Sequence, residues 1–384
     1  MREKFWVIDG RIQIKRVIHK CITCFHAKPR LISYKMGNLP SQRVRQARPF
    51  INVGVDYCGP FFIKEKKYRN QRFIKTYVAI FVCMATKAIH IEAAEDLSTE
   101  AFMAVFTRFI ARRGLSENIN SDNGKNFEGT NNELNELYLM LNSSETNEKI
   151  KHFSTKNRIN WHFIPPKAPN FGGLWEAMVG RFKYHFKRVA YDKKFTFCEF
   201  ITFCTEVEAI LNSRPLTPMS TDINDLSVLT PGHFLIGDSL RSMPEENYSL
   251  LPTNRLNAWQ NLKKIKQDLW SKWHKEYLSN LNFRQNKSSS SPKLKIGQLV
   301  LLQEDDVPCM EWPRARIHNV HPGDDGVIRT VTIKTSTGLL KRPSSKIAVL
   351  PIDEDCLRPL HLYISLYTYF YLLLLFIYLY KTLS

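Results

Sequence analysis

The sequence is poor in acidic residues. Its 384 residues include 36 Asp and Glu against 55 Lys and Arg, which gives a formal net charge of +19 and an isoelectric point near 9.5. A surplus of this size attracts polyanions, with nucleic acid first and an anionic membrane surface second. The chain is long enough for two or three domains with at least one sizeable core.

Closely spaced cysteines are scarce, and a secretory signal is missing. Only Cys21 and Cys24, of eight cysteines, have the spacing of metal ligands, and residues 1–10 are charged without an apolar core. We therefore expect a reduced, intracellular protein. Cys21 and Cys24 form half of a tetrahedral zinc site. Because His19 and His26 lie too close to complete it, the pair is either two incidental thiols or a site whose histidines lie upstream of this sequence.

Long uncharged runs are rare. Residues 362–380 alone have the length of a bilayer span. The segment contains six tyrosines, which prefer the membrane interface and would here lie at mid-membrane depth. We interpret it as a chance extension of the chain, with a membrane tail anchor as the alternative.

The most informative stretch is INSDNGKNF at 119–127. Residues 119–121 are typical of a strand end, and Asn123-Gly124 is a strong turn signal. Asp122 therefore lies at the carboxyl end of a strand, where α/β folds present functional side chains. An aspartate in a turn is more often simple turn chemistry.

Two further carboxylates, Asp56 and Glu176, suggest that Asp122 has a functional role. The β-rich run 50–60 places Asp56 before a Gly-Pro break, and Asn170-Phe171-Gly172-Gly173 leads into a helix that carries Glu176. Three carboxylates that can be reached from one sheet edge are what a two-metal phosphoryl-transfer site needs.

The order of the expected elements indicates a mixed α/β fold. After the strand at 50–57 we expect strands at 73–84 and 87–93, a helix at 98–113, the strand ending at Asp122, a helix at 131–141, a loop at 142–156 and a strand at 160–165. This order favours a ribonuclease-H-like layer arrangement over a uniform parallel sheet.

The helix that carries Glu176 has two faces. Helical spacing places its apolar residues in one stripe, namely Leu174, Met178, Phe182, Phe186 and Val189. Glu176 shares the opposite face with Lys183 and Lys187, and the basic residues Arg181 and Arg188 lie beside it. The face is either solvated or holds a metal-binding carboxylate next to ammonium groups that contact one DNA strand.

The C-terminal half begins with helices at 195–212 and 257–281, the second with an aromatic stripe that is typical of core contacts. Four serines at 288–291 indicate a flexible boundary. Short β runs at 298–303, 314–320 and 327–335 then predict a small barrel. Its basic residues either form a nucleic-acid surface or a solvated face. They are Lys293, Lys295, Arg314, Arg316, Arg329, Lys334, Lys341, Arg342 and Lys346.

Several segments together resemble the integrase of LTR retrotransposons, most closely the Pao/BEL type. They are FINVGVDYCGPF at 50–61, INSDNGKNFEG at 119–129, PPKAPNFGGLWEAMVGRFK at 165–183, LNSRPLTP at 211–218 and LTPGHFLIG at 229–237. KCITC at 20–24 resembles the second half of an integrase zinc module, and residues 259–278 with the barrel resemble the C-terminal part. The resemblance covers nearly everything except the tail.

The resemblance implies a domain order. It runs from an incomplete zinc-binding module at 1–40, through a ribonuclease-H-like catalytic core at 41–237 and a helical connector at 238–290, to an SH3-like β-barrel at 291–352 and a hydrophobic tail at 353–384. Two features depart from the family pattern. The zinc module lacks its histidine pair, so the chain is interpreted as truncated at its N-terminus, and the tail has no counterpart.

The resemblance also implies a metal site. Asp56, Asp122 and Glu176 match the family's metal-binding carboxylates, which hold two Mg²⁺ or Mn²⁺ ions. Their separations are 122 − 56 = 66 and 176 − 122 = 54 residues. The second is longer than in retroviral integrases, and the polar segment 142–156 can absorb the difference as an insertion. The zinc site at Cys21 and Cys24 is incomplete.

The implied activity is DNA 3′-end processing followed by strand transfer, in the nucleus and by a homo-oligomer. Lys183, Lys187, Arg181 and Arg188 would hold the DNA backbone. The alternatives are a nuclease that only hydrolyses, an inactive integrase-derived nucleic-acid-binding protein, and a membrane protein anchored through 362–380.

We expect Asp122→Asn to abolish strand transfer and leave DNA binding intact, because the amide keeps the size of the side chain but removes the charge that fixes an ion. A joining assay and a DNA-binding curve on the same preparation measure both effects. Normal joining by this variant would show that the metal assignment is wrong.

Overall fold

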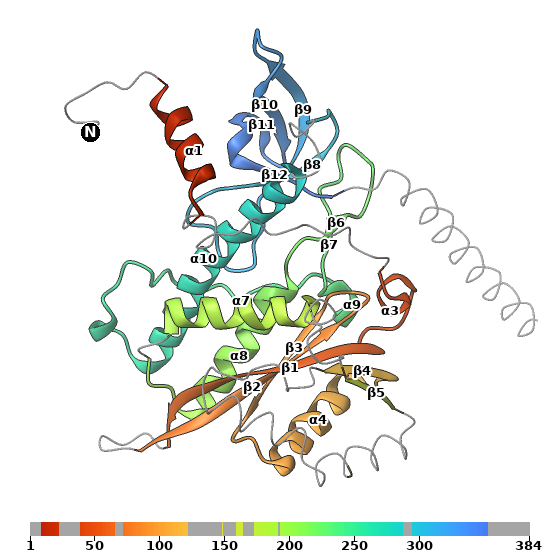
Figure 1. Ribbon diagram of the computed structural model, residues 1–384, viewed down its shortest axis with the longest axis vertical. Helices are drawn as coiled ribbons and strands as arrows, with labels where there is room; N and C mark the ends of the chain where they lie inside the picture. Colours follow the sequence, from red (N-terminus) through yellow and green to blue (C-terminus); the bar gives the residue numbers. More distant parts are fainter. Residues whose placement is uncertain are drawn as a thin grey trace, which may run out of the picture. The chain divides into compact units, whose positions relative to one another are not determined.

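The computed structural model describes residues 9–22, 39–65, 72–121, 148, 159–163, 173–190, 193–286 and 294–351 (Figure 1). Its contacts divide the chain into two units, 1–44 and 45–384. The described part of the first unit contains helix α1 (Gly10–Lys20) and the single turn α3 (Ser41–Val44). The domain limits expected within the second unit stay predictions.

A five-stranded mixed sheet forms the centre of the second unit. Its strands are β1 (Asn52–Lys64), β2 (Phe73–Cys83), β3 (Ile89–Ala94), β4 (Asn118–Ser121) and β5 (Asn160–Phe163), in the order β3-β2-β1-β4-β5. The first three strands are antiparallel, whereas β4 runs parallel to β1 and β5 parallel to β4. The predicted mixed α/β class is confirmed.

The prediction that the first strand ends near Tyr57 is wrong. Strand β1 continues to Lys64, and its pairing with β2 shifts register between Cys58 and Phe61, where Gly59 and Pro60 lie. Proline has no N–H to donate, so it interrupts the ladder at this point without ending the strand. Asp56 therefore lies in the middle of β1, opposite Ile80 of β2.

Helix α4 (Thr99–Arg113) covers one face of the sheet (Figure 1). Its buried residues are the four predicted from helical spacing, Phe102, Val105, Phe106 and Phe109, and they share a core with Val53, Val55 and Tyr57 of β1. The Ser98 side chain accepts a hydrogen bond from the Ala101 N–H and caps the start of the helix. Gly114, at φ +82°, ends it as predicted.

Helices α7 (Gly173–Ala190) and α8 (Phe197–Asn212) cover the opposite face. Helix α8 also protects the outer edge of β3. The Asn212 side chain accepts from the Ile89 N–H at 2.9 Å and donates to the Ile89 carbonyl at 2.8 Å, while the Glu208 carboxylate accepts from the Ile91 N–H at 2.8 Å. Two side chains one turn apart thus replace a neighbouring strand, which keeps this edge from pairing with another chain.

The predicted helix at 257–281 is α10 (Ala258–Asn286), which docks on α7 and α8. Most of its aromatic stripe is buried as expected, but Trp259 is 55% exposed. Two lysines of this helix, Lys263 and Lys266, are instead buried, because each pairs with Glu206 of α8 and with Glu245. Helical spacing places these lysines near the apolar stripe, and their acidic partners come from distant sequence.

A second, antiparallel sheet follows α10. Its strands are β8 (Leu299–Leu302), β9 (Arg314–Pro322), β10 (Ile328–Thr335), β11 (Gly338–Pro343) and β12 (Ile347–Val349), in the order β11-β10-β9-β8-β12. The first three agree with the predicted strands, and a separate apolar core lies beneath the sheet. Closure of this sheet into an SH3-like barrel stays a prediction.

The segment between α8 and α10 contains several short elements and forms hydrogen bonds with residues of the second sheet and the loop before β9. These elements are β6 (Thr217–Pro218), β7 (Val228–Leu229), α9 (His233–Ile236) and the 3-10 turn η2 (Thr253–Arg255), and a further turn, η3 (Ser344–Lys346), precedes β12. The Trp312 indole N–H donates to the Ser213 hydroxyl at 3.3 Å. The Lys334 ammonium donates to the Asn224 side chain at 2.7 Å.

The prediction that Arg316 belongs to a basic surface is wrong. Its side chain is 2% exposed, and the guanidinium donates to the backbone carbonyls of Ser220, Asp225 and Gly297 at 2.8–2.9 Å. Arginine can satisfy several carbonyls at once because its donors form a planar fork. Arg316 therefore ties the β6–β7 connection to the second sheet.

We expect Arg316→Met to lower the free energy of unfolding by about 2–4 kcal/mol, because it leaves three carbonyls without their donor. Arg329→Met is the matched control, because Arg329 is exposed and its ion pair with Asp325 is solvent-accessible, so its loss should leave the free energy of unfolding nearly unchanged. Urea unfolding followed by tryptophan fluorescence measures both. Equal midpoints for the two variants would contradict this role.

Candidate active site

Asp56 lies on the face of β1 that helix α7 covers. Side chains alternate along a strand, so Asp56 shares its face with Gly54 and Cys58. Cys58 packs in the core formed with α7, and a Cβ atom built on Gly54 would lie 2.0 Å from Cε3 of Trp175. The indole ring therefore lies directly on the backbone of β1, two residues before Asp56.

Glu176 follows Trp175 in the first turn of α7 and is half-buried, as is Asp56. The contact between Trp175 and Gly54 fixes the start of this helix against β1. The structure thus brings two of the predicted carboxylates to one interface between strand and helix, although they are 120 residues apart in sequence (176 − 56).

Strand β4 ends beside the part of β1 that contains Asp56. It runs parallel to β1, and its last residue, Ser121, pairs with Val55, the residue before Asp56. Asp122, which follows Ser121 in the chain, lies outside the described residues. The described residues contain no group of three or more His, Cys, Asp or Glu side chains that could hold a metal ion.

The predicted apolar stripe of α7 differs in detail from the observed one. The fully buried residues include Trp175 and Val179 along with the predicted Phe182 and Phe186, whereas the predicted Leu174, Met178 and Val189 are half-buried at its margin. The buried face is thus rotated toward Trp175, because the ring of this residue fills the space above Gly54.

Lys183 lies close enough to Cys58, the neighbour of Asp56 on the same strand face, to affect the pKa of its thiol. Burial raises the pKa of the Cys58 thiol, the positive charge of Lys183 lowers it, and the negative charge of Asp56 raises it. Both charged groups are therefore within electrostatic reach of the same sulfur. Lys183 is half-buried and two helical turns after Glu176, which places the two on the same side of α7.

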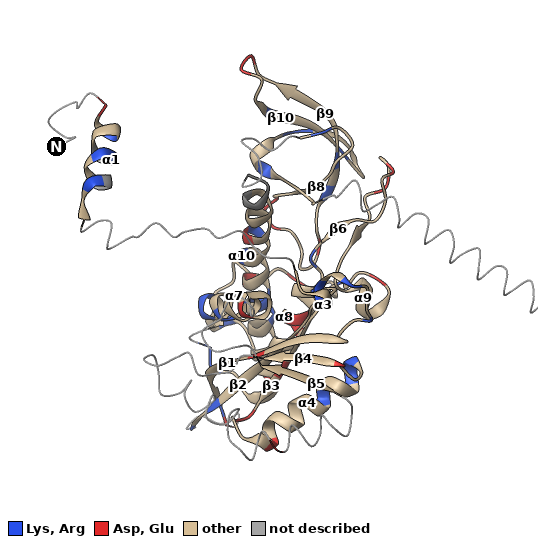
Figure 2. Ribbon diagram, turned by 45° about the vertical axis from the view of Figure 1, so that its right-hand side comes forward, with Lys and Arg blue, Asp and Glu red and all other residues tan. Residues whose placement is uncertain are grey.

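Basic positions occur along α7 (Figure 2), and the other predicted DNA-binding residues of this helix differ in exposure and partners. Lys187 is exposed and Arg181 half-buried. The Arg188 guanidinium pairs with Glu276 of α10 and lies 4.9 Å from the ring centre of Tyr184. Arg188 thus joins α7 to α10, a contact that nothing in the local sequence indicates.

The edge strand β3 carries a separate group of buried charged residues. His90 lies 3.2 Å from Glu92 and 3.3 Å from Glu208. Burial disfavours the charged ring, but hydrogen bonds to Glu208 and Glu92 outweigh it and raise the pKa of His90. Arg108, on the neighbouring helix, donates to Glu92 at 2.8 Å. These groups satisfy one another, so we assign them to the stability of the sheet.

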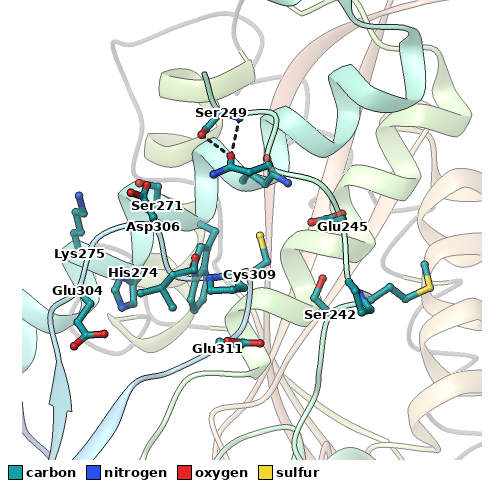
Figure 3. A pocket seen from close by; sticks show the side chains of 17 residues that line it. Ser242, Glu245, Ser249, Ser271, His274, Lys275, Glu304, Asp306, Cys309 and Glu311 are labelled. Atoms are coloured by element: carbon teal, nitrogen blue, oxygen red, sulfur yellow. Dashed lines mark hydrogen bonds between the residues drawn. The ribbon is translucent and has the colours of Figure 1, made fainter. Parts of the chain in front are cut away.

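A cavity of about 360 Å³ lies between α10 and the loop before β9 (Figure 3). The carboxylates of Glu245, Glu304, Asp306 and Glu311 line it, with the indole of Trp270 and the imidazole of His274. Burial lowers the pKa of His274 to about 4, so the ring is neutral near pH 7. An acidic lining repels phosphate groups, and we do not assign this cavity to nucleic acid.

Residues 257–350 match a family of unknown function, DUF5641. No curated protein sequence matches the chain. Among solved structures the chain is similar to the simian T-cell lymphotropic virus intasome in complex with PP2A regulatory subunit B56 gamma, with 12% identity, a TM-score of 0.35, and 89% of this chain and 92% of that chain covered. It is also similar to the HTLV-2 integrase catalytic core domain in complex with magnesium, with 18% identity, a TM-score of 0.31, and 50% and 99% covered.

The predictions for the two ends of the chain stay open. Cys21 is half-buried, while Cys24 lies outside the described residues. None of the described helices is long and apolar enough to span a bilayer. The segment 362–380 also lies outside the described part.

We expect Gly54→Ala to destabilise the protein by about 1–3 kcal/mol, because its new methyl group has no room beside the Trp175 ring. Gly180→Ala is the control within α7, because nothing lies within 4 Å of the added carbon and alanine favours the helix by about 1 kcal/mol.

Thermal unfolding of the two variants and of Gly54→Ala/Trp175→Leu measures the effect. The smaller side chain should restore part of the stability lost in Gly54→Ala. If the double variant were less stable by the sum of the two single changes, Trp175 would not press on Gly54.

Proposed function

We propose that this chain is an LTR-retrotransposon-type integrase, of the Pao/BEL kind, that carries out DNA 3′-end processing and strand transfer. The observation that supports the proposal is the contact of Trp175 on α7 with Gly54 on β1, because Glu176 follows Trp175 in the chain and Asp56 lies two residues after Gly54. The motifs at 50–61, 119–129 and 165–183 contain the three carboxylates that the family uses.

The topology of the sheet supports a ribonuclease-H-like core. Three antiparallel strands are followed by two strands parallel to β1, with α4 on one face and α7 and α8 on the other. In this arrangement β4 ends next to the middle of β1, since Ser121 pairs with Val55. The next residues of the two paired segments are Asp122 and Asp56, which is why we place them in one site.

The donor set fits a hard divalent cation. Carboxylate oxygens are the ligands that Mg²⁺ and Mn²⁺ prefer. Asp56 and Glu176 are half-buried, so part of each carboxylate is removed from water and can be held in one orientation. We assign Asp56, Asp122 and Glu176 as the residues that would hold two such ions. Bound there, the ions supply activation of the attacking oxygen and stabilisation of the leaving 3′ oxygen.

The other residues of the site would position Glu176 and the DNA backbone. The Trp175 ring fixes the start of α7 against β1, so Glu176 approaches the strand in one geometry. Lys183 lies on the same side of the helix and Lys187 one turn further, where their ammonium groups can hold successive phosphates. Positioning and charge stabilisation account for most of the rate enhancement in phosphoryl transfer.

The exposed basic residues of the second sheet would add sequence-independent affinity for DNA. Lys341 is exposed on β11, and Arg314 on β9. Other members of the predicted basic surface have acidic partners, because Arg329 pairs with Asp325 and Arg342 lies 3.6 Å from Glu304. The surface available for DNA is therefore smaller than the sequence indicated.

A joining assay on blunt linear DNA ends with Mg²⁺ or Mn²⁺ tests the proposal. Wild-type protein should produce strands longer than the substrate, and Asp56→Asn and Glu176→Gln should reduce joining at least about a hundredfold. Glu117→Gln is the control, because this exposed carboxylate immediately precedes β4 and is not one of the three predicted metal ligands.

The products distinguish the rival activities. Shortened strands without joined strands would indicate a nuclease that only hydrolyses. DNA binding without any product, in either metal, would indicate an inactive integrase-derived binding protein. Full joining by Glu176→Gln would contradict the site itself.

A further inference from the structure

A second cavity, of about 540 Å³, lies where the segment after α9 meets the beginning of β9. Arg241 of this segment and Arg314, the first residue of β9, both line it. Trp312 and Ser213 form part of its wall, so the cavity adjoins the contact between the LNSRPLTP segment and the second sheet.

The two arginines have no acidic partner of their own. No hydrogen bond or ion pair joins either guanidinium to another described residue, in contrast to Arg329, which forms two hydrogen bonds with Asp325 at 2.6 and 2.8 Å. Burial lowers the pKa of Arg314, Asp225 raises it, and the positive charge of Arg241 lowers it further. Two cations thus face one cavity and repel each other.

The nearest carboxylates are hydrogen-bonded elsewhere. Asp225 accepts from the Ser227 N–H at 2.7 Å and from its hydroxyl at 2.8 Å. Asp238 accepts from the Ser239 N–H at 2.6 Å. Neither comes within ion-pair distance of an arginine that lines the cavity. Asp225 and Asp238 therefore offset part of the positive charge from a distance, but no ion pair within the described residues occupies the guanidinium donors of the two arginines.

The rest of the lining suits an oxyanion. The hydroxyls of Thr230, Ser239 and Ser242 line the cavity and can donate to oxygen atoms. Glu311 also lines it and is the one carboxylate that the described residues contribute to the wall. Guanidinium forks bind phosphate oxygens in a bidentate manner, and a pair of forks on one cavity can hold one phosphate from two sides.

We propose that Arg241 and Arg314 together bind a phosphodiester group of a DNA backbone at this junction. The proposal rests on the proposed function for its ligand, because a chain that acts on DNA meets phosphodiester groups in long, continuous arrays. The site is separate from the carboxylates of β1 and α7. It would hold the DNA where the core and the second sheet meet, so that both contact the same duplex.

Fluorescence anisotropy of a short labelled DNA duplex, with the full chain and with EDTA in place of a divalent metal, tests the site. Arg241→Ala/Arg314→Ala should weaken binding about tenfold more than the control, since hydrogen bonds to a charged group are lost. The slope of log affinity against log salt should fall by about one. The control is Arg255→Ala/Arg329→Ala, which removes the same charge from exposed positions. Equal weakening by the two double variants would overturn the proposal.

Glu311→Gln provides a test in the opposite direction. It removes the negative charge of the cavity wall, so it should tighten DNA binding about threefold by Coulomb attraction alone. Unchanged or weaker binding by this variant, at the salt concentration where the wild type is half-bound, would contradict the site.

Inorganic phosphate distinguishes a backbone group from a free anion. If the pair binds DNA, phosphate should compete with DNA no better than sulfate at equal ionic strength. If phosphate raises the unfolding temperature of the wild type but not of Arg241→Ala/Arg314→Ala, and both bind DNA equally, the pair is a site for a small anion and the proposal is wrong.

The joining assay separates this site from the proposed activity. Wild-type joining with no specific effect of the two arginines on DNA affinity would refute only the site. DNA binding that depends on the pair, in a protein that never joins ends, would refute only the integrase activity.

Discussion

The close contact of Trp175 with Gly54 is the constraint on which the candidate site depends. Only glycine allows an indole ring to lie this near to a central strand, and the ring in turn sets the height and rotation of α7. Glu176 and Lys183 take their positions from that rotation, and Asp56 lies on the same strand face two residues after Gly54. A packing contact between an apolar ring and a backbone thus determines where the charged groups meet, because close-packed interiors transmit small shifts.

The second half of the molecule is joined to the first through satisfied polar groups within an apolar core. Arg316 donates to three backbone carbonyls, Trp312 donates to Ser213, and the Tyr277 hydroxyl donates to the Pro215 carbonyl. Buried polar groups of this kind cost stability unless every partner is present, so they specify one arrangement of the two parts. This arrangement places the Arg241 and Arg314 cavity at the junction, where a single duplex can touch both parts.

The local sequence patterns predicted most of the helices and strands. The faces and ends of α4, the strands of the first sheet, three strands of the second sheet and the presence of α10 follow from periodicity, caps and turns, and these were found, whereas β11 and β12 were not predicted. The course of β1 past Pro60, the burial of Arg316 and the burial of Lys263 were missed, because each depends on a partner distant in sequence. For the site, the motifs indicated Asp56 and Glu176 and the structure brings them to one interface, whereas Asp122 lies outside the described residues. Gly54 and Trp175 carried a sequence signal, since both belong to recognised motifs, but only their packing shows what they do.

The central claim is that Asp56, Asp122 and Glu176 hold the same metal ions. Iron-mediated cleavage measures this most directly, because Fe²⁺ bound in place of Mg²⁺ produces hydroxyl radicals, with peroxide and ascorbate, that cut the polypeptide next to the ion. Mass spectrometry of the fragments should show cuts near all three positions, and excess Mg²⁺ should suppress all three together. Cuts near only one of the three, or cuts that Mg²⁺ does not suppress, would contradict a shared site.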